Sequence, residues 1–164
     1  MGFTHLVFGI LLYALFSNVF QVPFGTAYPL LAVTLGSLLP DIDHPSSLIS
    51  KQAVFSIVSK AVRRVARHRG PTHSLLFTVL STAVVAAVVL YYGEDLLISI
   101  TFAIGYLSHL IADSLTRSGV RWLWPFHDGE ASFVFHTGGL AEKAFFWGSL
   151  LGLAWTVQNL QMFG

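Results

Sequence analysis

Five long apolar stretches, separated by short polar segments, divide the chain. They are Phe3–Phe20, Phe24–Leu39, Ser74–Tyr92, Leu96–Leu115 and Leu140–Leu160. A helix that crosses a membrane needs about 20 mostly apolar residues, so each stretch is a candidate span. The second is short, because Pro40 disfavours helix at the preceding residue and ends the run. The pattern predicts an all-α fold, a polytopic membrane bundle of about five transmembrane helices in a single domain over residues 1–164.

The polar segment between the second and third stretches has a pattern of its own. At about 100° per residue, one helical face carries apolar side chains and the opposite face carries basic ones. The apolar face holds Phe55, Val58, Val62 and Val65, and the basic face holds Lys60, Arg63, Arg64 and Arg67. We expect an amphipathic interfacial helix on the cytoplasmic side, lying in the headgroup layer. A helix that packs its apolar face on the spans remains the alternative.

Composition supports a membrane protein. Only 10% of the residues are charged, against roughly 25% in a soluble domain. The chain has no cysteine, which excludes disulfides and thiolate metal ligands. The first stretch lacks the basic start and the A-x-A site of a cleaved signal peptide, so we expect it to remain as a span. The lipid bilayer is the expected partner, no nucleic acid is expected, and the oligomeric state stays open.

Lysine and arginine in the short loops predict the orientation. Residues 40–73 hold six of them and residues 116–139 hold Arg117 and Arg121, whereas the loops at 21–23 and 93–95 hold none. With five crossings both basic loops lie on one side. We therefore expect an inner (plasma) membrane protein with a cytoplasmic N-terminus.

This topology brings the ligand-type side chains to one membrane face. They are His5, Asp41, Asp43, His44, His68, His73, His109, Asp113 and Glu142. His109 and Asp113 are four residues apart, on one side of a helix, and a charge inside a span is costly unless it is paired or bound. Isolated hydrogen bonding, a helix–helix pair and a helix stop at "PDIDHP" are the simpler readings of the separate motifs. Their convergence favours a metal site.

The first eight of these side chains exceed the four to six ligands that one ion takes, so a mononuclear and a dinuclear site both stay open. Imidazole and carboxylate ligands suggest a divalent metal, with zinc as the first choice and manganese, iron or magnesium as alternatives. Arg69 is not a ligand type; its guanidinium suits a phosphate or carboxylate, and Thr72 would help to hold that group. A carboxylate outside the metal shell, Asp43 or Glu142, would take the proton in a hydrolysis.

Four separate motifs carry a resemblance to a known family. "THLVFG", "LLPDIDHPSS", "HRGPTHSLL" and "GYLSHLIADSLTRSGVRWLWPF" resemble the YdjM-like family of LexA-regulated inner-membrane proteins, which are described as metal-dependent hydrolases. The similarity runs over residues 1–126 and resumes near Glu142. It implies a multi-pass membrane protein with a bound divalent metal. It lends less support to His5 and Glu142, and it implies no substrate. The site residues that the resemblance supports are Asp41, Asp43, His44, His68, His73, His109 and Asp113.

We therefore expect a membrane-bound metal-dependent hydrolase with its site at the cytoplasmic interface, where an amphiphilic, anionic substrate such as a phospholipid or another phosphoester would fit. The alternative is a non-catalytic metal-binding membrane protein for storage, sensing or a stress-response adaptor role. An open coordination position at the metal would favour the enzyme.

Overall fold

The computed structural model describes residues 2–44, 47, 71–127, 129–133 and 138–162. The helices in these ranges are α1 (Gly2–Phe20), α2 (Ala27–Leu38), η1 (Leu39–Asp43), η2 (Pro71–His73), α4 (Leu75–Tyr91), α5 (Leu97–Ser114) and α6 (Leu140–Met162). η1 and η2 are short 3-10 helices. The described residues form no strand, and an antiparallel bridge joins Val120 and Ala131. The all-α prediction is confirmed.

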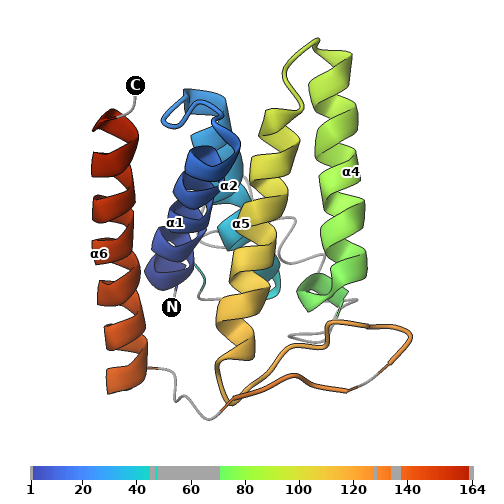
Figure 1. Ribbon diagram of the computed structural model, residues 1–164. Helices are drawn as coiled ribbons and strands as arrows, with labels where there is room; N and C mark the ends of the chain where they lie inside the picture. Colours follow the sequence, from blue (N-terminus) through green and yellow to red (C-terminus); the bar gives the residue numbers. More distant parts are fainter. Residues whose placement is uncertain (1, 45–46, 48–70, 128, 134–137, 163–164) are drawn as a thin grey trace.

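The long helices stand side by side with α5 at the centre of the contacts (Figure 1). α2 and α4 both pack on α5, α1 packs on α2 and α5, and α6 packs on α1. α1, α4 and α6 begin at the lower end of the bundle in Figure 1, where α2 and α5 end. We call this the polar end, because the predicted site residues of these helices fall there.

Two glycines bring α2 and α5 into close contact. A Cβ atom at Gly36 would clash with the carbonyl oxygen of Phe102, and a Cβ atom at Gly105 would clash with that of Val33. Small residues permit this approach of helix backbones, a common device in membrane bundles. The α2–α5 contact therefore fixes how the end of α2 meets the last turns of α5.

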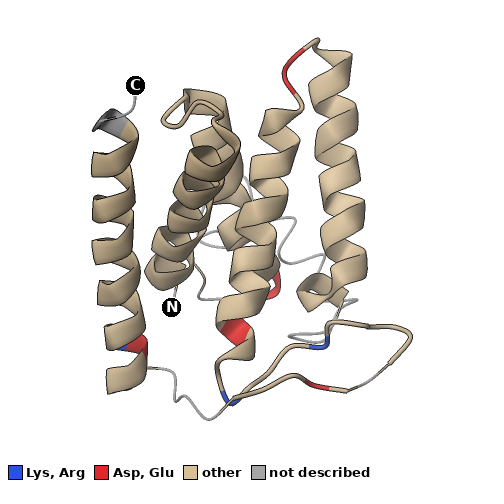
Figure 2. Cartoon of the chain, viewed as in Figure 1, with Lys and Arg blue, Asp and Glu red and all other residues tan. Residues whose placement is uncertain are grey.

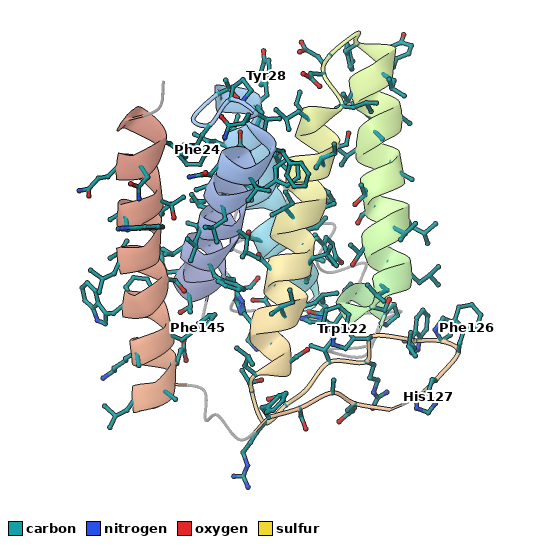
Figure 3. The ribbon with its side chains drawn as sticks, viewed as in Figure 1. Phe24, Tyr28, Trp122, Phe126, His127 and Phe145 are labelled. Atoms are coloured by element: carbon teal, nitrogen blue, oxygen red, sulfur yellow. The ribbon has the colours of Figure 1, made fainter. Side chains whose placement is uncertain are left out.

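The segment that follows α5 is tied to the start of α4 at the polar end. The backbone N–H of Leu75 donates to the carbonyl of Trp122 at 2.9 Å, and the Trp122 indole N–H donates to the Ser114 hydroxyl at 2.8 Å. Figure 3 shows Trp122 beside the base of α4. Ser74 caps α4 by accepting from the N–H of Phe77 at 3.2 Å. These bonds position the residues just before Ser74.

The predicted number of membrane crossings is only partly supported. Among the described helices, α1 and α5 are long and apolar enough to span a membrane, while α4 is apolar but has 17 residues. α2 has 12 residues, or about 18 Å, because the chain turns at Gly25 and passes into a 3-10 helix before Pro40. Five crossings stay a prediction, and the predicted amphipathic helix lies outside the described residues.

Candidate metal centre

Five side chains from four elements meet at the polar end. They are His5 from α1, Asp41 from η1, His73 from η2, and His109 and Asp113 from α5. They form two overlapping groups, His5–His109–Asp113 and Asp41–His73–His109, and within each group the ligand atoms lie within 4.8 Å of one another. Figure 2 shows acidic positions, coloured red, near this end of α5 and α6. We call the five residues the His/Asp cluster.

Asp113 faces all three histidines. Its Oδ1 lies 3.4 Å from Nε2 of His5, and its Oδ2 lies 3.5 Å from Nε2 of His73 and 3.8 Å from Nε2 of His109. Asp41 closes the other side, since its Oδ1 lies 3.7 Å from Nε2 of His109 and 3.9 Å from Nε2 of His73. The i, i+4 pairing of His109 and Asp113 therefore places both on the same centre.

The partner of each Nδ1 atom fixes the tautomer of two histidines. Nδ1 of His109 lies 2.7 Å from the carbonyl oxygen of Ser37, which only accepts, so Nδ1 carries the proton. The Thr72 hydroxyl donates to Oδ2 of Asp43 at 3.2 Å, which leaves its oxygen to accept from Nδ1 of His73 at 3.1 Å. In both rings the lone pair on Nε2 then points into the cluster.

This arrangement suits a cation. Nε2 of His109 is buried and has no hydrogen-bond partner among the described residues. The N···O separations of 3.4 to 3.9 Å exceed the 2.7–3.2 Å of a usual N–H···O hydrogen bond. With bonds of about 2.0–2.2 Å, neighbouring ligands of a tetrahedral ion lie about 3.3–3.6 Å apart. Two of the separations, 3.4 and 3.5 Å, fall in this range and the other three are 0.1 to 0.3 Å longer. The chemistry of the side chains present therefore fits a metal, with a spacing slightly wider than that of a bound tetrahedral ion.

The cluster is enclosed except at Asp41. His5, His73, His109 and Asp113 are buried, and the His5 ring stacks on the His109 ring with centroids 4.0 Å apart. The Asp41 side chain keeps 23% of its surface exposed. Among the described residues, Asp41 therefore marks the side from which a small molecule could reach the cluster.

The other predicted site residues lie around the cluster or outside the described chain. Asp43 is buried and accepts from the Thr72 hydroxyl, whose oxygen lies 3.1 Å from Nδ1 of His73. His44 ends η1 and is half-buried. Glu142 accepts from the Thr4 hydroxyl at 3.2 Å and from the N–H of Gly138 at 2.6 Å. His68 and Arg69 lie outside the described residues.

Sequence reasoning missed two contributors. Tyr106 donates its hydroxyl proton to the carbonyl of Thr72 at 2.6 Å, and it precedes His109 by three residues, so helical spacing offered a signal. The Ser37 contact is made by a backbone carbonyl, so the residue type at position 37 does not predict it. Thr72, expected to help hold an anion, instead lies between Asp43 and His73.

Comparison with known proteins shows which family the chain belongs to. Residues 1–162 match the family described as the YdjM inner membrane protein. The chain belongs to this family. The inner membrane protein YdjM of Escherichia coli (strain K12) is 42% identical over 95 residues, covering 56% of this chain and 46% of the relative. The uncharacterized protein YvsG of Bacillus subtilis (strain 168) is 41% identical over 91 residues, covering 56% of this chain and 53% of the relative.

The chain spans about half the length of the curated YdjM-family relatives that it matches. No solved structure matches it. Membership of the YdjM family confirms the resemblance in the motifs and makes this an inner membrane protein, in agreement with the apolar α1 and α5 helices.

Proposed function

We propose that this protein is a membrane-bound metal-dependent hydrolase whose metal is held by Asp41, His73, His109 and Asp113. The observation that carries the proposal is the convergence of two imidazole Nε2 atoms with two carboxylate oxygens in a buried site. Two lone pairs that face carboxylates repel them unless a cation lies between. His5 faces the other carboxylate oxygen of Asp113, Oδ1, where it would complete a dinuclear site or support a mononuclear one.

The spacing of the ligand atoms supports zinc over magnesium. Octahedral magnesium, with bonds of about 2.0–2.1 Å, brings neighbouring ligands to about 2.8–3.0 Å. The N···O separations here are 3.4 Å and longer, nearer to those of a tetrahedral ion. Mixed imidazole and carboxylate ligands suit zinc as well, with manganese and iron as alternatives.

A divalent ion at this position would polarise a scissile oxygen and lower the pKa of bound water toward neutrality. Asp43 orients His73 through Thr72, which keeps the ring nitrogen aimed at the cluster. Asp43 or Glu142 would take the proton from the attacking water. The exposed edge of Asp41 is the side from which substrate would approach.

The substrate class follows from location and from Arg69. The described basic residues Arg117, Arg121 and Lys143 flank α5 and α6 at the polar end, whereas the opposite loop carries Glu94 and Asp95 (Figure 2). By the positive-inside rule this end faces the cytoplasm and the N-terminus is cytoplasmic. A site there suits an amphiphilic substrate, and the guanidinium of Arg69, one residue from His68, suits a phosphoester such as a phospholipid.

A non-catalytic metal-binding role is the second candidate. The burial of four of the five cluster residues favours it, because structural and storage sites are closed whereas catalytic sites keep an open position. The two roles differ in whether an exogenous ligand reaches the metal and in whether any substrate turns over.

The test is hydrolysis of a panel of phospholipids and simple phosphoesters by metal-loaded protein in detergent. We expect Arg69→Ala to keep its metal and lose about 10²-fold or more in turnover, because a guanidinium stabilises charge that grows in the transition state. Arg69→Lys should keep the metal with reduced turnover, since the charge remains without the planar fork. Arg117→Ala is the control, an arginine outside the segment "HRGPTHSLL" that contains Arg69. No turnover by the wild type, or wild-type turnover by Arg69→Ala, would favour the non-catalytic role.

A further inference from the structure

An apolar groove lies between α2 and α4 on the surface of α5. It encloses about 550 Å³, within the range of ligand-binding pockets. Its floor is made by the buried side chains of Ala32, Val89 and Phe102. Its walls are exposed apolar side chains: Leu31 and Leu35 of α2, and Val84 and Val88 of α4.

The groove occupies the half of the bundle away from the His/Asp cluster. It follows α2 from Tyr28 to Leu35 and α4 from Val84 to Tyr92, about 10–12 Å along the helices. Figure 3 shows Tyr28 at the end of the bundle opposite Trp122. One leaflet contributes about 15 Å to the hydrocarbon core, so the groove is long enough for most of one acyl chain in that leaflet.

The mouth of the groove is polar and acidic. Tyr28, Tyr92 and Glu94 line it, and the loop at residues 93–95 has two carboxylates and no basic residue. The Asp95 carboxylate accepts from the N–H of Leu97 at 2.8 Å, whereas Glu94 is exposed beside the groove. An acidic mouth above an apolar channel complements a lipid whose headgroup ends in an ammonium group and disfavours a lipid with a net anionic headgroup.

We propose that this groove binds one acyl chain of an amine-headgroup phospholipid in the leaflet opposite the His/Asp cluster, with the ammonium group at Glu94. As a member of an inner-membrane family, the chain has phospholipid around its helices. This binding is separate from the proposed hydrolysis and does not require the metal.

The experiment compares retained lipids by native mass spectrometry of the full chain, extracted from membranes of equal phosphatidylethanolamine and phosphatidylglycerol content. Val84→Trp and Val88→Trp, made separately, fill the groove from its α4 wall. Val79→Trp is the matched control, because Val79 and Val84 are both 64% exposed on α4 and Val79 does not line the groove. Circular dichroism and elution profile establish that each variant is folded.

We expect the wild type and Val79→Trp to retain one lipid, with phosphatidylethanolamine favoured about two- to fivefold, the range of an exposed ion pair. Val84→Trp and Val88→Trp should lose most of this lipid, and Glu94→Gln should keep lipid without the headgroup preference. Wild-type retention by both groove variants, equal loss in Val79→Trp, or a dimer that the groove variants abolish would overturn the groove as a lipid site. An unchanged preference in Glu94→Gln would overturn the role of the amine.

Discussion

The carbonyl oxygen of Ser37 lies 2.7 Å from Nδ1 of His109, and this contact joins the end of α2 to the cluster on α5. In a 3-10 helix each carbonyl accepts from the N–H three residues later. For Ser37 that residue is Pro40, which has no N–H. Pro40 therefore removes the 3-10 partner of this carbonyl and leaves it available to the imidazole. The tautomer of His109 depends on how closely α2 and α5 pack.

Gly105→Ala tests this dependence. The added Cβ would clash with the Val33 carbonyl oxygen, so α2 must move away from α5 and Ser37 must move with it. We expect a loss of about 1–3 kcal/mol in stability, typical of overpacking, together with weaker metal binding. Thermal unfolding in detergent and metal content measure the two effects. Gly148→Ala is the control, because no described side chain or other helix lies within 4 Å of a Cβ atom there. Equal behaviour of the two variants would contradict the role of the close contact.

The Thr72 hydroxyl is expected to orient His73. Thr72→Val preserves the shape of the side chain but removes both bonds of the hydroxyl, to Asp43 and to His73. Loss of a group that orients a ligand weakens metal binding by about 10- to 100-fold. A competition titration with a chelating dye measures the change, and Thr72→Ser should restore most of the affinity. If Thr72→Val binds as tightly as the wild type, Thr72 does not fix the tautomer of His73.

Single cysteines test the orientation, since the chain has none of its own. We expect Ser56→Cys and Ser132→Cys to react only with reagents that enter the cytoplasm, and Gly93→Cys to react from outside. The reason is the excess of Lys and Arg in the loops at residues 40–73 and 116–139. External labelling at residue 56 or 132 would place the polar end on the opposite side.

Much of the fold was readable from the sequence. The apolar runs predicted α4 between Leu75 and Tyr91 and α5 between Leu97 and Ser114 almost to their ends, because uncharged runs of that length are typical of helices that avoid water. The joint position of His5, His73, His109 and Asp113 was also predictable. Alternating helix directions bring the starts of α1 and α4 to the end of α5.

Other features depend on contacts between distant residues. The second apolar stretch suggested a span, yet α2 stops after 12 residues. The 3-10 helix η1, which contains Asp41, follows α2 directly. The Ser37–His109 bond joins residues 72 positions apart. The close approach that makes Gly36 necessary, where a Cβ atom would clash with Phe102, is visible only once both helices are placed. The proposed roles of His68 and Arg69 stay predictions, because both residues lie outside the described residues.

Metal content of the purified protein tests the central claim most directly. Inductively coupled plasma mass spectrometry should find a bound divalent ion in the wild type and in His127→Ala, a control histidine that is exposed and outside the cluster. His109→Ala and Asp113→Ala should each lose about tenfold or more of the ion under the same dialysis, while the folded protein still inserts in the membrane. A wild type without metal, or full metal content in both cluster variants, would contradict the account.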